Sequence, residues 1–229
     1  MKSWHHLGMD TPDYRGIMHA QKDFYVLDKL IPAANTVVVE QTHSDLIHIC
    51  GHEDGGAGFG THAQIAVADG MITNIPGQYL LIRTADCTPV LFLDKQNRAV
   101  GAVHSGREGT RKNIAGKAVK LMYQSYGIPP EDIIAYIGAG ICTRHYQVNQ
   151  EIWEAFNASM EALGVTPDLS LERHINIRLC IFQELILAGI PYRNIEQEII
   201  CTYESPRHFS YRRDGTRNRQ INMVGIEYD

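Results

Sequence analysis

Three short apolar runs follow one another in the middle of the chain, at 79–83, 90–93 and 99–103, with few polar residues between them. Apolar runs of this length, bounded by turn-forming residues, are typical of strands that are buried in a core. The polar segment 94–98 predicts a hairpin turn, which makes the second and third runs neighbours in one sheet. We therefore expect the chain to fold around buried β-structure.

Segments on either side of these runs predict further strands and helices. We expect strands at 36–40 and 46–50, which should pair, and at 133–137, 199–202 and 220–226, and helices at about 21–30, 109–126, 150–163 and 174–188. Strands come first and are then mixed with helices, without the strict alternation of a doubly wound parallel sheet. The expected fold class is α+β, with mixed sheets, helices packed outside them, and a single domain over residues 1–229.

Composition narrows the class of protein. A net charge of −5 argues against non-specific nucleic-acid binding. The five cysteines are odd in number and form no Cys-x-x-Cys pair, which suits a reducing cytosol better than a disulfide scaffold. No apolar stretch approaches the roughly 18 to 20 residues of a membrane span, and the N-terminus lacks the apolar core of a secretory signal. We expect a cytoplasmic protein that binds neither nucleic acid nor membranes.

One cysteine and two histidines stand where predicted strands end. Cys87 precedes the second apolar run, His104 follows the third, and His43 lies between the strands expected at 36–40 and 46–50. One sulfur and two nitrogens can bind a catalytic Zn²⁺ and leave its fourth position open. A different interpretation stays open for each residue, since free cysteines are often buried small hydrophobic residues and lone histidines often serve structure.

The order of short motifs gives the three residues a common interpretation. Seven collinear segments resemble the laccase-domain family, also called the purine nucleoside phosphorylase family and formerly multicopper polyphenol oxidase. They are Gln41-Thr42-His43, Ala68-Asp69-Gly70, Thr84-Ala85-Asp86-Cys87-Thr88-Pro89-Val90, Ala102-Val103-His104-Ser105-Gly106, Gly138-Ala139-Gly140-Ile141, Cys201-Thr202-Tyr203 and Phe209-Ser210-Tyr211-Arg212-Arg213-Asp214. The resemblance extends from about residue 41 to residue 226, and Thr-Ala-Asp-Cys with the later Val-His-Ser-Gly is its most specific pair.

This resemblance implies a metal site, a fold and an activity. The metal ligands would be His43, Cys87 and His104, and the metal would be Zn²⁺. Copper is a weaker choice, because three ligands are too few for the several coppers of a multicopper oxidase. The implied fold is a four-layer α/β/β/α arrangement with two mixed β-sheets. The implied activity is phosphorolysis of adenosine, inosine and methylthioadenosine together with adenosine deamination, so that a purine nucleoside and phosphate would be the partners.

Further residues are candidates for roles beside the metal. Asp86 and Asp69 could orient a ligand histidine or act as a general base. Asp69 fits equally well as a turn residue before Gly70. Arginines suit phosphate because the guanidinium fork matches its oxygens. The candidates for that role are Arg212, Arg213 and Arg83, with Arg219 behind them, and each of these also fits a solvated surface.

The chain departs from the family pattern after His104. Gly106-Arg107-Glu108-Gly109 stands where the family usually has Gly-Trp-Arg-Gly. If the family arginine contacts phosphate, Glu108 would repel it unless Arg107 takes over. Two alternatives therefore stay open: a cysteine hydrolase acting on a peptide or cell-wall precursor amide, with Cys87 as nucleophile and His104 as base, and a non-catalytic protein that binds metal or nucleoside.

Overall fold

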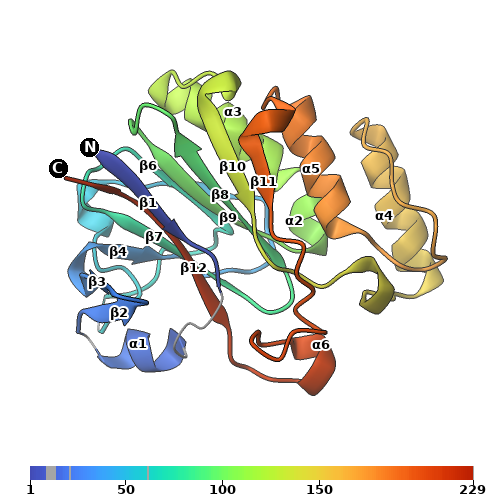
Figure 1. Ribbon diagram of the computed structural model, residues 1–229, viewed down its shortest axis with the longest axis horizontal. Coiled ribbons are helices and arrows are strands. Elements are labelled where there is room, and N and C mark those ends of the chain that lie inside the picture. The colour runs from blue at the N-terminus through green and yellow to red at the C-terminus, as the bar shows by residue number, and fades with distance from the viewer. Residues whose placement is uncertain (9–13, 21, 61, 229) are drawn as a thin grey trace.

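Two β-sheets lie face to face in the computed structural model, which describes residues 1–8, 14–20, 22–60 and 62–228 (Figure 1). The four-stranded sheet has the order β1-β12-β7-β4, formed by β1 (Lys2–His6), β12 (Gln220–Glu227), β7 (Tyr79–Thr84) and β4 (Thr36–Val38). The six-stranded sheet has the order β11-β10-β8-β9-β6-β5, formed by β11 (Ile195–Gln197), β10 (Ile133–Ile137), β8 (Thr88–Asp94), β9 (Val100–Ser105), β6 (Gly70–Thr73) and β5 (Ile47–Ile49).

Both sheets are mixed. In the six-stranded sheet β8 pairs antiparallel with β9 and with β10, whereas β10–β11 and β5–β6 are parallel pairs. In the four-stranded sheet β7 is antiparallel to β12 and parallel to β4. Strand β1 pairs with β12, so that the two ends of the chain lie side by side (Figure 1).

Helices cover the outer face of each sheet. Along one flank of the six-stranded sheet lie α2 (Arg107–Arg111), α3 (Ile114–Tyr126), α4 (Gln150–Ala162) and α5 (Ile177–Leu187) (Figure 1). The opposite flank, outside the four-stranded sheet, carries α1 (Tyr14–Ala20) and a hairpin of β2 (Phe24–Val26) and β3 (Lys29–Ile31). The short helix α6 (Tyr211–Asp214) precedes β12. The α+β fold with two mixed sheets between helical layers is as expected.

Side chains of the central strands are buried alternately in different cores. Leu80 and Ile82 pack between the two sheets, whereas Leu81 packs on the outer face of the four-stranded sheet. In β8, Leu91 points between the sheets and Phe92 packs under the helices. Because both faces of these strands are covered, their sequences are continuous apolar runs and do not alternate with polar residues.

Several expected elements have different bounds or partners. The region near 21–30 holds β2 and β3 and no helix over 22–30, while residue 21 lies outside the described residues. The expected pairing of 36–40 with 46–50 is wrong, because β4 belongs to the four-stranded sheet and β5 to the six-stranded sheet. Residues 199–202 form no strand and make one bridge between Gly140 and Cys201. The strand β1 was not expected. No helix among the described residues has the length and apolar character to cross a bilayer.

Candidate metal centre and pocket

Two of the chain segments that pass from one sheet to the other meet beside the end of β9. The connection from β4 to β5 carries His43, the connection from β7 to β8 carries Cys87, and His104 is the penultimate residue of β9. Antiparallel pairing sets Pro89 opposite His104, which brings Cys87 to that strand end. Sheet topology thus gathers three side chains that lie far apart in the sequence.

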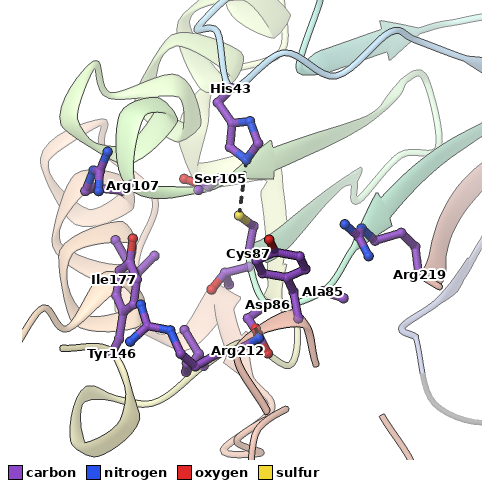
Figure 2. Close-up of a pocket in the computed structure, with 14 residues that line it drawn as sticks. His43, Ala85, Asp86, Cys87, Ser105, Arg107, Tyr146, Ile177, Arg212 and Arg219 are labelled. Atoms are coloured by element: carbon purple, nitrogen blue, oxygen red, sulfur yellow. Dashed lines mark hydrogen bonds between the residues drawn. The ribbon is translucent and has the colours of Figure 1, made fainter. Parts of the chain in front are cut away.

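The three donor atoms are close enough to share one ion. Each pair of ligand atoms from His43, Cys87 and His104 lies within 4.8 Å. The Cys87 Sγ atom is 3.8 Å from His43 Nε2, the contact drawn as a dashed line in Figure 2. Zinc bonds of about 2.3 Å to sulfur and 2.0 Å to nitrogen in a tetrahedron place these atoms about 3.5 Å apart. His104 is buried and His43 is exposed, so the site faces the solvent on the His43 side.

Asp69 orients two of these ligands. Its Oδ1 atom is 2.7 Å from His104 Nδ1, and its backbone oxygen accepts a hydrogen bond from the His104 backbone N–H. The carboxylate also accepts hydrogen bonds from three consecutive backbone N–H groups, those of Thr42, His43 and Ser44. These bonds hold His43 in the left-handed region, at φ of 62°. With Nδ1 of His104 engaged, its Nε2 atom is the one available to a metal.

The electrostatics favour an ionised thiol. Burial raises the pKa of Cys87, but His104 and His43 together lower it further, so that it falls to about 6. Burial lowers the pKa of His104, whereas Cys87 and Asp69 raise it to about 9. Burial also raises the pKa of Asp69, yet hydrogen bonds, with that from His104 first, bring it to about 2. A thiolate is the form of cysteine that binds metals.

Gly106 keeps the space between the ligands free. A Cβ atom at this position would lie 2.7 Å from Cys87 Sγ and 3.0 Å from the His43 ring carbon Cδ2. Both distances are too short for ordinary contact, so a larger residue would push the ligands apart. The residues present therefore fit a Zn²⁺ ion held by one sulfur and two nitrogens.

A cavity of about 360 Å³ opens directly beside Cys87 (Figure 2). Its walls combine apolar, aromatic and cationic side chains, among them Ile141, Tyr146, Ile177, Tyr211, Arg107, Arg212 and Arg219. Its volume lies within the range of about 300 to 1,000 Å³ typical of small-molecule sites. A second cavity of about 250 Å³, on the side of Arg83, also reaches His43, Cys87 and His104.

The arginines expected to bind phosphate lie on different sides of the site. Arg212 lines the main cavity, where its guanidinium lies over the Tyr146 ring and donates to the Gln147 backbone oxygen at 3.0 Å. Arg83 lies on the other side of the site, in the second cavity, and donates to the Val39 backbone oxygen. Arg219 reaches both cavities.

Arg213 is not brought to either cavity that reaches Cys87. Its guanidinium donates to the backbone oxygens of Thr202, Tyr203, Ser205 and His208 and pairs with Asp214. In the structure these bonds fasten the segment before α6.

Asp86 borders the main cavity and holds two segments of the chain in place. Its Oδ1 atom accepts a hydrogen bond from the Thr202 hydroxyl at 2.6 Å, and its Oδ2 atom accepts one from the Arg212 backbone N–H at 2.8 Å. The carboxylate thereby ties α6, and with it the Arg212 side chain, to the connection that carries Cys87.

The departure after His104 leaves a cation facing the cavity. Arg107 lines it, and Glu108 does not. The Glu108 carboxylate accepts from Arg107 Nε at 3.1 Å and from Arg111 at 2.9 to 3.0 Å. Although burial raises the pKa of Glu108, these arginines bring it below its usual range. The negative charge of Glu108 is thus compensated within α2.

Tyr146 and Ile177 line the cavity without having been singled out in the sequence. Tyr146 follows a short 3-10 helix, Thr143–His145, and Ile177 begins α5. Neither stands in a chemically distinctive motif. Tyr211 lies within the Phe-Ser-Tyr-Arg-Arg-Asp segment and directly precedes Arg212, which was a candidate. That position could have indicated Tyr211 as a site residue.

Comparison with known proteins identifies the family. A family model described as "Multi-copper polyphenol oxidoreductase laccase" matches residues 7–227. The chain belongs to this family. The resemblance seen in the sequence motifs is confirmed, and the three expected ligands of this laccase-family chain are close together in space.

Relatives in the family are named as nucleoside phosphorylases. A protein of Bacteroides thetaiotaomicron named purine nucleoside phosphorylase is 33% identical over 162 residues, which cover 69% of this chain and 60% of that protein. Purine nucleoside phosphorylase YlmD of Bacillus subtilis is 30% identical over 196 residues, covering 83% and 70%. The crystal structure of YlmD from Geobacillus stearothermophilus superposes with a TM-score of 0.79 at 27% identity, covering 86% of this chain and 76% of that one. The chain thus spans 60 to 70% of the length of these two sequence relatives.

Proposed function

We propose that this protein is a zinc-dependent purine nucleoside phosphorylase that cleaves adenosine, inosine and methylthioadenosine and also deaminates adenosine. The observation that carries the proposal is the convergence of His43, Cys87 and His104 at the edge of a cavity that holds both aromatic rings and arginines. The names of the relatives support the same class of reaction.

The cavity offers groups for each part of the substrates. Tyr146 and Tyr211 supply ring faces for a purine, and Ile141 and Ile177 supply apolar contact. The Arg212 guanidinium lies over the Tyr146 ring, and Arg107 lines the same cavity. Two guanidinium groups on one side of the cavity suit a phosphate dianion, because they donate charge-assisted hydrogen bonds to its oxygens.

Phosphorolysis needs both substrates held together in this cavity. A phosphate oxygen forms a bond to C1′ of the ribose while the bond from C1′ to N9 of the purine breaks. The leaving purine takes up the proton that phosphate gives up, so that ribose 1-phosphate and the free base result. The protein contributes by binding phosphate through arginines and by aligning it with C1′ against the apolar wall.

Deamination uses the metal ligands more directly. When bound, Zn²⁺ with an open fourth position lowers the pKa of water to about 7, which supplies a nucleophile for C6 of adenine as ammonia leaves. The chain itself fixes the geometry of the ligands. Asp69 holds His104 in one tautomer, and the hydrogen bond that the His43 backbone N–H donates to the Asp69 carboxylate holds His43 beside Cys87.

Metal analysis paired with product analysis tests this function. Purified protein should contain zinc at the His43, Cys87 and His104 site, and should release adenine from adenosine only with phosphate and inosine without it. His43→Ala, Cys87→Ala and His104→Ala should each lose one zinc and both products. Zinc at full occupancy with no product from any of the three nucleosides would contradict the catalytic proposal and favour a binding protein.

A cysteine hydrolase is the second candidate, because one observation favours it. Asp69, His104 and Cys87 form a carboxylate, imidazole and thiol series in which the pKa of the thiol falls to about 6. Iodoacetamide distinguishes the two functions. Rapid alkylation of Cys87 in zinc-replete protein, with loss of amidase activity, would support the hydrolase, whereas a zinc-bound sulfur should react slowly.

A further inference from the structure

A second group of side chains that could bind a metal ion lies next in sequence to Ile141 and Tyr146, which line the main cavity. Its ligand atoms all lie within 4.8 Å of one another and belong to Cys142, His145, Cys201 and Glu204. Cys142 precedes the short 3-10 helix Thr143–His145, which follows β10, and His145 is the last residue of that helix. Cys201 and Glu204 lie in the segment after β11. A cavity of about 250 Å³ opens beside Cys142, Cys201 and Glu204.

Backbone contacts hold the two segments together independently of these side chains. Gly140 and Cys201 form a parallel bridge, and the Thr202 backbone N–H donates to the Gly140 oxygen at 3.2 Å. One side-chain contact adds to these backbone contacts, because the Cys142 backbone N–H donates to Cys201 Sγ at 3.2 Å. The two cysteines are therefore brought together by the fold, although 59 positions separate them in the sequence.

His145 lies between the two sulfurs. Its Nδ1 atom is 3.3 Å from Cys142 Sγ, 3.7 Å from Cys201 Sγ and 3.5 Å from Glu204 Oε1. In a tetrahedral zinc site, ligand atoms at about 2.0 to 2.3 Å from the metal lie about 3.3 to 3.8 Å from one another. The imidazole is held in this orientation by stacking on Tyr203, with ring centroids 4.3 Å apart.

A cationic side chain lines the cavity beside the cluster. Arg178 is partly buried, and its Nε atom has no hydrogen-bond partner among the described residues. Its side chain borders the same cavity as Cys142 and Cys201. Glu204 is exposed and also pairs with Arg144, which makes it the weakest of the four ligands.

We propose that Cys142, His145, Cys201 and Glu204 bind a second zinc ion, whose role is structural. This ion would hold in place the loop that contains Ile141 and Tyr146, which line the main cavity. The Gln147 backbone oxygen in the same loop accepts a hydrogen bond from the Arg212 guanidinium. A disulfide between Cys142 and Cys201 would use only the sulfurs. The position of His145 Nδ1 near both sulfurs and near Glu204 favours a metal.

The test counts metal in protein from which the first site's sulfur has been removed. Cys87→Ala protein, stripped with chelator and reconstituted with Zn²⁺ alone, should retain one zinc per chain, with two sulfur ligands by X-ray absorption. Adding Cys201→Ala should abolish that zinc, whereas adding Cys180→Ala, a buried cysteine of α5 outside the cluster, should leave it. Because Cys87 is absent throughout, the outcome does not depend on the proposed activity.

Unchanged zinc content after Cys201→Ala would overturn the proposal, as would a Cys142–Cys201 disulfide found by mass spectrometry in protein purified without oxidant. If the Cys201 variant does not fold, alkylation of the parent chain decides. Zinc should protect Cys142 and Cys201 from iodoacetamide, and chelator should expose them. Equal alkylation with and without zinc would contradict a metal site.

Discussion

At the scale of single residues, Asp69 connects the fold to the candidate metal centre. One carboxylate contacts the ring of His104 and the backbone that carries His43, so its loss should disturb two ligands at once. We expect Asp69→Asn to weaken zinc binding by about 10- to 100-fold, as is usual when the partner of a ligand histidine is removed. Competition with a chromogenic chelator measures this. Asp94→Asn, which removes a buried carboxylate paired with Arg98 far from the ligands, should lower stability and leave zinc affinity unchanged.

The thiol of Cys87 should show its electrostatic environment when metal is absent. In metal-free protein its pKa of about 6 lies below the ordinary value of 9.0, so the reactive thiolate forms as pH rises through about 6. The alkylation rate of Cys87 should therefore rise with a midpoint near pH 6. His104→Ala removes the larger favourable charge and should move the midpoint upward. A midpoint near 9 in the unaltered chain would contradict the arrangement of the two imidazoles.

Gly106 is the position where one added carbon should matter most. Gly106→Ala places a Cβ atom 2.7 Å from Cys87 Sγ. Relief of such crowding typically costs about 1 to 3 kcal/mol, so we expect zinc affinity to fall about tenfold or more. Gly16→Ala in α1 is the matched control, because a Cβ atom there meets nothing within 4 Å. Equal zinc affinity in both variants would show that the ligands can move apart freely.

At the scale of elements, the proposed function assigns α2 a part in binding phosphate. Arg107 lines the cavity, whereas Arg111 in the same helix pairs with Glu108 and does not line that cavity. We expect Arg107→Ala to reduce kcat/KM for phosphate by about ten- to a hundredfold, the loss usual for one charge-assisted hydrogen bond. The KM for nucleoside should change less. Initial rates at varied phosphate measure both, and Arg111→Ala should leave the phosphate dependence nearly intact.

The elements that could be predicted from the sequence are those with a strong local pattern. Strands β7, β8 and β9 were clear because both of their faces are buried, and α3 followed from its apolar spacing and from Gly127 at its end. By contrast, β2 and β3 are three residues each, too short to show a period. The prediction that β4 pairs with β5 was wrong because local sequence does not reveal where a chain passes from one sheet to another.

The site divides in the same way. The three expected metal ligands could be named because their motifs resemble those of the family, and the structure brings their ligand atoms within 4.8 Å of one another. Tyr146 and the pair Cys142 and Cys201 could not be recognised. Their positions depend on the loop after β10 meeting a segment 59 positions further on, and nothing in either segment indicates that contact.

At the scale of the whole molecule, the three candidate ligands lie where the chain passes between the two sheets. His43 and Cys87 lie on segments that pass between the sheets, and His104 is the penultimate residue of a strand of the six-stranded sheet. A metal bound by all three would hold in place segments that must separate when the protein unfolds. Zinc therefore should stabilise the folded state by an amount that grows with its concentration, because the unfolded chain does not keep the ligands together.

At free zinc about a thousandfold above the dissociation constant, this stabilisation amounts to about 4 kcal/mol. For a chain of this size, we expect a rise in Tm of roughly 10 °C between chelator-treated and zinc-replete protein. Calorimetry at several zinc concentrations measures it. Cys87→Ala should remove the part that belongs to the first site, and Cys201→Ala the part that belongs to the second. If the losses of Tm in the two single variants add up in the double variant, the two ions stabilise separate parts of the molecule. A Tm that does not respond to zinc in the unaltered chain would refute both sites.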